Sequence, residues 1–308
     1  MALGGNPIFN GKNFRGATQA PPVPQAQYGQ NPYGQAPYGQ NSYGQAPGRA
    51  PGQVMDAQGG WMAQQQNMTH DQLQQMYNQP AAGPAETGRM TFDDVIIKTA
   101  ACLGVLVAGA AVTLFVGMSL ASLLMIVGAL GGFVLAMVNT FKKQPSPALI
   151  LAYAGLEGLF LGGLTRVLDT MYPGVGLQAV IGTLSVFAVT LLLFKSGKVR
   201  ATPKAMKFFM IALVGYALFS VVNLVMTVTG LTTEPFGLRS GIIGVVIGVL
   251  AIGLAAFSLV MDFTSIEEGV RNGAPERFSW TAAFGLTVTL VWLYVEIIRL
   301  LAILRGDD

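Results

Sequence analysis

Charged side chains are scarce in this chain. Asp, Glu, Lys and Arg make up 11% of its 308 residues, whereas hydrophobic residues make up 52%. Soluble domains usually contain about 25% charged residues, so the composition favours a lipid environment. The net charge is only +3, and no dense basic patch of the kind that binds nucleic acid is present. A nucleic-acid partner is therefore not expected.

Cysteine and histidine are almost absent as well. The chain has one cysteine, Cys102, and one histidine, His70. These two residues cannot form an intramolecular disulfide, a usual zinc site, a Cys–His pair within the apolar part or a serine triad. An aspartyl hydrolase would need two facing Asp side chains, and the apolar spans contain only one Asp. The sequence thus predicts no enzyme, no catalytic residue, no metal site and no cofactor.

Residues 1–90 form a polar segment with few aliphatic side chains. Four Tyr-Gly-Gln units begin at Tyr28, Tyr33, Tyr38 and Tyr43, at a spacing of five. Such a segment cannot repay a backbone ordering cost of about 1–2 kcal/mol per residue. We therefore expect a disordered tail that acts as a spacer, with a weakly self-associating arm as the alternative. No apolar stretch of a secretory signal follows Met1.

Residues 91–308 predict an all-α membrane domain. Thr91 and two acids that follow it are typical of a helix N-cap. Each of the subsequent apolar stretches approaches or exceeds the roughly 20 residues that a helix needs to cross a bilayer. The predicted spans are 95–116, 119–140, 147–168, 175–195, 206–229, 240–262 and 279–304. The boundary near Gly117 has no charge, and a tight hairpin is expected there. Glycines in the second, third and sixth spans predict close helix packing.

Basic residues in the short loops predict the orientation. Eleven Lys and Arg residues fall on the side of the tail and four on the opposite side. The positive-inside rule then places the N-terminus in the cytoplasm. The absence of a secretory signal, together with a long cytoplasmic tail, suits a bacterial inner membrane.

Charged residues within the spans are the candidate functional residues, because a charge at the bilayer centre costs at least about 2.5–3.5 kcal/mol. Glu157 lies near the middle of the third predicted span and has no basic neighbour within one turn. It must meet a partner on another helix, contact water or be protonated, and either a pathway role or a structural hydrogen bond would account for it. Asp262 ends the sixth predicted span. Glu296 and Arg299 have the i, i+3 spacing of an ion pair on one helical face.

Asp262 and Glu296 could share a proton or bind a cation if their side chains were in contact. Two close carboxylates share a proton, and they can also bind a hard cation through oxygen ligands. The sequence alone leaves open whether these two residues meet, and each of them alone also has a purely structural interpretation.

The last two spans contain the segments 255-AAFSLVMDF-263, 266-IEEG-269 and 293-LYVEIIRLLAILR-305, and the third span contains 154-AGLEGLFLG-162. In these segments the chain resembles the Bax inhibitor (YccA-like) family. The resemblance covers roughly Asp93 to Arg305 and implies a seven-helix bundle with the last helix in the centre. Some members are similar to pH-sensitive calcium leak channels, whose gate is a carboxylate pair with a nearby base. The resemblance assigns Asp262 and Glu296 to that pair and Lys142 to the base.

Three departures accompany the resemblance. The second acid is Glu rather than Asp, the base is Lys rather than Arg, and Gly269 to Phe278 lengthen the last loop. Other bacterial relatives are similar to modulators of membrane proteases. Two hypotheses follow: a cation (calcium) leak or proton-linked pathway through Asp262, Glu296 and Glu157, and a non-conducting bundle that binds another membrane protein.

Overall fold

The computed structural model describes residues 88–306, apart from 233 and 235. Seven α-helices in this part are long and apolar enough to cross a membrane. They are α4 (Phe92–Phe115), α5 (Met118–Phe141), α6 (Pro147–Met171), α7 (Val175–Lys195), α8 (Pro203–Val228), α9 (Gly241–Arg271) and α10 (Ser279–Gly306). Two short 3-10 helices, η1 (Gly237–Arg239) and η2 (Glu276–Phe278), precede α9 and α10. The predicted all-α membrane bundle is confirmed, and most of the predicted tail lies outside the described residues.

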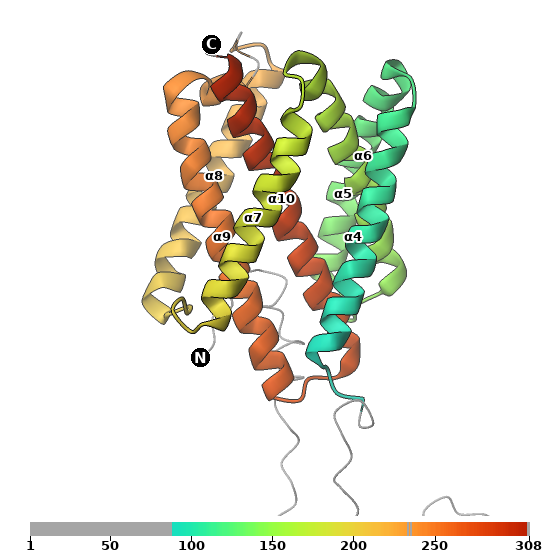
Figure 1. The fold of residues 1–308 in the computed structure, drawn as a ribbon, viewed down its shortest axis with the longest axis vertical. Helices are drawn as coiled ribbons and strands as arrows, with labels where there is room; N and C mark the ends of the chain where they lie inside the picture. The colour runs from blue at the N-terminus through green and yellow to red at the C-terminus, as the bar shows by residue number, and fades with distance from the viewer. Residues whose placement is uncertain (1–87, 233, 235, 307–308) are drawn as a thin grey trace, which may run out of the picture. The chain divides into compact units, whose positions relative to one another are not determined.

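Successive helices run in opposite directions, so the short loops alternate between the two ends of the bundle (Figure 1). The hairpin between α4 and α5 contains only Val116 and Gly117, as predicted. Thr91 begins α4 with a capping box: its hydroxyl accepts a hydrogen bond from the Asp94 amide at 3.1 Å, and the Asp94 carboxylate accepts one from the Thr91 amide at 3.0 Å.

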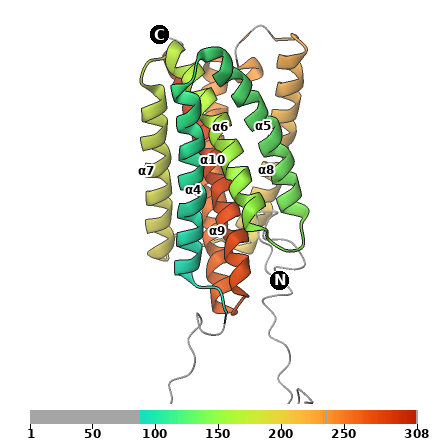
Figure 2. The same cartoon turned by 90° about the vertical axis from the view of Figure 1, so that its right-hand side faces the viewer.

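The last helix is the centre of the bundle. α10 packs against α9, α4, α7 and α6, and it lies behind α4 and α6 when the bundle is turned (Figure 2). The most apolar window of α10 is 61% buried, whereas that of α8 is 6% buried. The central position that the family resemblance implied for the last helix is therefore confirmed.

Glycines bring α4, α5 and α6 close together. A Cβ atom added to Gly158 of α6 would collide with the backbone carbonyl of Leu106 in α4. A Cβ added to Gly128 of α5 would lie 2.5 Å from the carbonyl oxygen of Leu156 in α6. Close backbone approach is what small residues provide between helices in lipid, and the predicted packing role of these glycines is confirmed.

The sixth span is longer than predicted, and this corrects the environment of Asp262. α9 continues to Arg271, because buried side chains such as Phe263 and Ile266 keep packing on the bundle core after the hydropathy falls. Gly273 follows the cap residue Asn272 with a positive φ of 66°, and its amide donates a hydrogen bond to the carbonyl of Val270 at 3.1 Å, which closes the end of the helix. Asp262 therefore lies inside a helix and not at its end. The last loop is correspondingly short.

Gly88 and Met90 form backbone hydrogen bonds with the loop between α9 and α10. The Met90 amide donates to the Ala274 carbonyl at 2.7 Å, and the Glu276 amide donates to the Gly88 carbonyl at 2.9 Å. The Met90 side chain is fully buried. These contacts attach the residues just before the α4 cap to the bundle.

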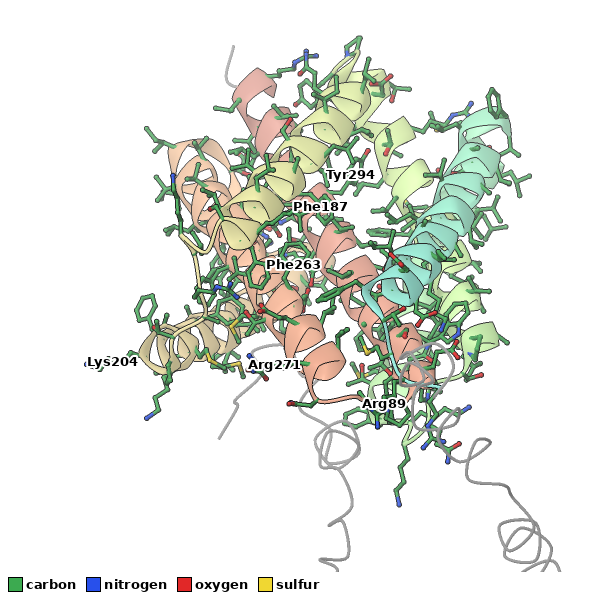
Figure 3. All side chains as sticks on the ribbon, turned by 60° about the horizontal axis from the view of Figure 1, so that its bottom comes forward. Arg89, Phe187, Lys204, Phe263, Arg271 and Tyr294 are labelled. Atoms are coloured by element: carbon green, nitrogen blue, oxygen red, sulfur yellow. The ribbon has the colours of Figure 1, made fainter. Side chains whose placement is uncertain are left out.

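Basic residues gather at the end of the bundle where α4 begins. Figure 3 shows Arg89, Lys204 and Arg271 at this end. By the positions of their helix ends and loops, the full group is Arg89, Lys98, Lys142, Lys143, Lys195, Lys198, Arg200, Lys204, Lys207, Arg271 and Arg277. Arg166, Arg239, Arg299 and Arg305 lie toward the opposite end. The charge asymmetry predicted from the sequence is thus a feature of the fold.

Candidate functional site

Asp262 is a buried carboxylate that faces the central helix. Its side chain has no exposed surface, and its Oδ2 accepts a hydrogen bond of 2.7 Å from the hydroxyl of Thr289 in α10. Thr289 is itself 2% exposed. A charged group without water is costly unless it is hydrogen-bonded, so this hydroxyl is part of what stabilises the carboxylate there.

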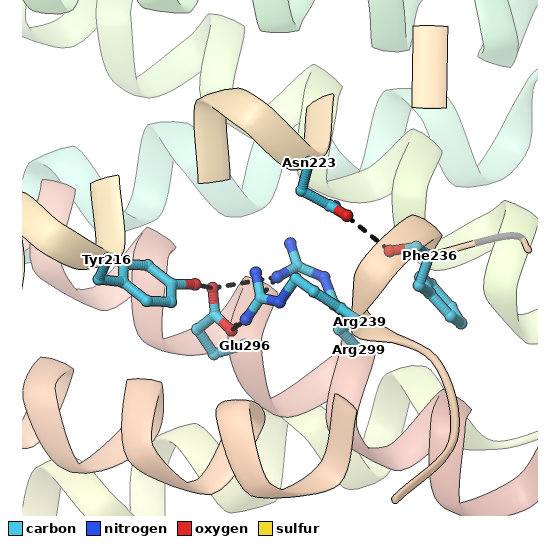
Figure 4. A network of polar contacts seen from close by, with 6 residues as sticks. All are labelled: Tyr216, Asn223, Phe236, Arg239, Glu296 and Arg299. Carbon is cyan, nitrogen blue, oxygen red and sulfur yellow. Dashed lines mark hydrogen bonds and ion pairs between the residues drawn. The ribbon is translucent and has the colours of Figure 1, made fainter. Parts of the chain in front are cut away.

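Glu296 lies in a different environment. Its Oε2 forms an ion pair of 2.6 Å with Nη2 of Arg239, which belongs to η1. Nη1 of Arg299 lies 3.2 Å from Oε1, so the predicted i, i+3 pair is confirmed. The hydroxyl of Tyr216 in α8 donates a short hydrogen bond to Oε1. We call Tyr216, Arg239, Glu296 and Arg299 the Glu296 cluster (Figure 4).

The structure does not place Asp262 and Glu296 side by side. Asp262 is bonded to Thr289, and Glu296 follows Thr289 by seven residues in α10. Seven residues correspond to about two turns, or roughly 10 Å along a helix axis. The residue of α10 that faces Asp262 is a threonine, and the carboxylate pair expected from the resemblance is replaced by two separate sites.

Arg239 was overlooked as a site residue because the sequence places it in a polar loop. It is 4% exposed, and its guanidinium carbon lies 5.2 Å from the centre of the Tyr216 ring. Asn223 of α8 holds this loop: its Nδ2 donates to the Phe236 carbonyl at 3.2 Å, and its Oδ1 accepts from the Leu238 amide at 2.7 Å. The polar amide within the fifth span was the only sequence signal for this arrangement.

Glu157 and Lys142 lie apart from both sites. A Cβ added to Gly132 of α5 would lie 2.8 Å from Oε1 of Glu157, so this glycine leaves room for the carboxylate between α5 and α6. Glu157 is partly exposed. Lys142 is exposed at the end of α5, and within the described part of the chain no ion pair joins it to Asp262. The base that the resemblance assigned to the gate is therefore exposed and forms no ion pair with Asp262 within the described part of the chain.

The described residues contain no group of three or more His, Cys, Asp or Glu side chains that could hold a metal ion. What they provide is a single buried carboxylate in contact with the central helix and, about two turns away along that helix, a carboxylate bonded to two guanidinium groups. The second arrangement has more positive than negative charge.

The comparisons with known proteins agree with this architecture. A family model described as Bax inhibitor 1 like matches residues 6–306. The comparison with curated proteins gives no match.

Proposed function

The chain belongs to the Bax inhibitor 1 like family, and on that premise we propose that it forms a pH-sensitive leak pathway for a cation such as calcium. It is an integral membrane protein with several spans. In this proposal Asp262 is the controlling carboxylate. The proposal replaces the carboxylate pair with one acid and the hydroxyl of Thr289.

The observation that supports the proposal is the burial of Asp262 at the contact between α9 and α10. This carboxylate has no exposed surface, and it accepts a hydrogen bond of 2.7 Å from the hydroxyl of Thr289 in the central helix. Carboxylate oxygens are ligands that calcium prefers. A small movement of α9 against α10 would open the bond to Thr289 and present the carboxylate to a passing ion.

A dependence on pH follows from the chemistry of this acid. Protonation of Asp262 would remove the negative charge that attracts a cation and would leave the α9–α10 contact intact. The elements that pack against α9 carry the following charged side chains: Asp93, Asp94 and Lys98 of α4, Lys195 of α7, Lys204 and Lys207 of α8, Arg239 of η1, and Glu296, Arg299 and Arg305 of α10. Most of these side chains lie near helix ends. We therefore expect a fall in pH to act mainly through the protonation of Asp262.

Calcium flux into liposomes that contain the purified full chain tests this proposal. We expect Asp262→Asn to change the flux and to weaken its dependence on pH. Glu268→Gln, which removes an acid from a partly exposed position six residues further along α9, is the matched control and should leave both unchanged. Equal flux from the wild-type and Asp262→Asn proteins, both shown to be folded, would contradict the proposal.

The second candidate, a non-conducting bundle that modulates a partner such as a membrane protease, gives a distinct result. In that case neither the wild-type chain nor the variant would conduct calcium. Both candidates include a bacterial inner membrane and a cytoplasmic N-terminus. The eleven basic residues at one end of the bundle support this orientation.

A further inference from the structure

A cavity of about 460 Å³ lies beside the Glu296 cluster. Its walls come from α8, from the loop that contains η1, and from α10. The lining residues are Tyr216, Ser220, Asn223, Leu224, Thr227, Phe236, Arg239, Trp292, Val295, Glu296 and Arg299. Volumes of this order are typical of sites for small ligands.

The charges on this cavity do not balance. Two guanidinium groups, Arg239 and Arg299, face one carboxylate, Glu296. Among the described residues, these are the only charged side chains in the lining. Charges within a membrane are almost always paired, because an unpaired one costs several kcal/mol. The excess positive charge would therefore be stabilised by a bound anion.

Two buried polar atoms of the same lining have no hydrogen-bond partner among the described residues. They are Nε of Arg239 and the hydroxyl oxygen of Ser220. The Arg239 side chain is 5% exposed. Both atoms are donors, and a buried donor without a partner is costly. Asn223, by contrast, is already bonded to the backbone of residues 236 and 238.

We propose that this cavity binds a phosphate group. A phosphate offers several oxygens to the planar N–H groups of arginine, and the hydroxyl of Ser220 would donate a further hydrogen bond. Arg299, which is 24% exposed, would bind the ligand from the more open side. The binding site does not depend on the proposed calcium pathway, because Glu296 and its two arginines lie about two turns along α10 from Thr289, the residue that bonds Asp262.

The phosphate has two chemical sources, a phospholipid headgroup and free inorganic phosphate. Leu224, Trp292 and Val295 add an apolar wall to the cavity, which would accommodate the part of a lipid next to its phosphate. The two sources differ in which probe binds to the protein, a phospholipid or inorganic phosphate. Binding measurements with both probes on the same proteins therefore distinguish them.

The experiment uses the full chain in a neutral detergent and a phosphate-free buffer. Retention of phosphatidylglycerol, with phosphatidylcholine for comparison, is measured by native mass spectrometry. Binding of inorganic phosphate is measured by the rise of the melting temperature. If the source is a lipid, phosphatidylglycerol binds and inorganic phosphate does not. If it is free phosphate, the melting temperature rises and the lipid is not retained.

Ser220→Ala and Arg299→Gln should each weaken binding by about tenfold or more, since each removes a hydrogen bond to a charged group. Ser220→Ala breaks no bond of the described structure, so its melting temperature without ligand should equal that of the wild type. Arg305→Gln is the matched control, because Arg305 lies on the same helix outside the cavity, with Nη1 donating to the Pro173 carbonyl at 2.5 Å. The proposal is overturned if neither probe binds, or if the Ser220→Ala and Arg299→Gln proteins bind as the wild type does.

Discussion

Arg239 and Arg299 bond the same carboxylate, and their removal should nevertheless have unequal effects on stability. Replacement of either arginine with glutamine removes one positive charge and leaves Glu296 in place. The two partners differ in burial: the Arg239 side chain is 5% exposed and lies 2.6 Å from Glu296, whereas Arg299 is 24% exposed and lies at 3.2 Å. The two variants thus compare the stability contributed by a buried ion pair with that contributed by a partly exposed one, and both pairs share the carboxylate of Glu296.

The expected magnitudes follow from this difference. Breaking a buried ion pair by removal of one partner usually costs about 3–5 kcal/mol. Arg239→Gln also removes the contact with the Tyr216 ring, while Arg299 and Tyr216 continue to stabilise the carboxylate. We therefore expect a loss of about 3 kcal/mol in the free energy of unfolding. Arg299→Gln should cost about 1 kcal/mol or less, as i, i+3 pairs and partly exposed pairs do.

Titration with a denaturing detergent, in phosphate-free buffer, measures both values. Trp292 lies 5.7 Å from the Tyr216 ring and gives a fluorescence signal close to the cluster. Arg305→Gln serves as the control for loss of a positive charge at this end of the bundle. Equal costs for Arg239→Gln and Arg299→Gln would refute the claim that burial decides the strength of these pairs.

Gly158→Ala should destabilise the bundle by about 1–3 kcal/mol through overpacking against α4. Gly104→Ala has nothing within 4 Å of its added Cβ, so it should be neutral or slightly stabilising. Melting temperatures in detergent check both predictions. Thr91→Ala removes the N-cap of α4 and should cost about 1 kcal/mol, seen by the same assay. Tyr216→Phe removes a donor to Glu296 and should cost about 1.5–3 kcal/mol in the denaturing-detergent titration; a value near zero would show that the tyrosine hydroxyl does not stabilise the carboxylate.

Hydropathy predicted the seven helices well, because a bilayer requires long apolar runs and leaves few alternatives to a helix. The predicted limits of six spans lie within about three residues of the observed helices. The sixth was predicted to end at residue 262 and continues to 271. Hydropathy detects where the chain becomes polar. It does not detect a helix that continues beyond that point because its side chains pack on the core of the bundle.

The polar sites were harder to predict, since they join residues that are distant in sequence. Glu296 and Arg299 are three apart on one helix, so helical periodicity was enough to find their pair. Arg239 is 57 residues from Glu296, and a loop arginine gives no local sign that it is buried. Thr289 was missed for a related reason: a hydroxyl among apolar residues is usually bonded to its own helix, and nothing in the sequence marked it as the partner of Asp262.

The most direct test of the account is calcium flux through the full chain in liposomes, at acidic and at mildly alkaline pH, for Asp262→Asn and Glu296→Gln side by side. The account predicts that Asp262→Asn changes the flux and its pH dependence. Folded Glu296→Gln protein should retain the pH dependence of the wild type, because Glu296 belongs to a separate cluster. Loss of the pH dependence in Glu296→Gln, with Asp262→Asn unaffected, would contradict the assignment of control to Asp262.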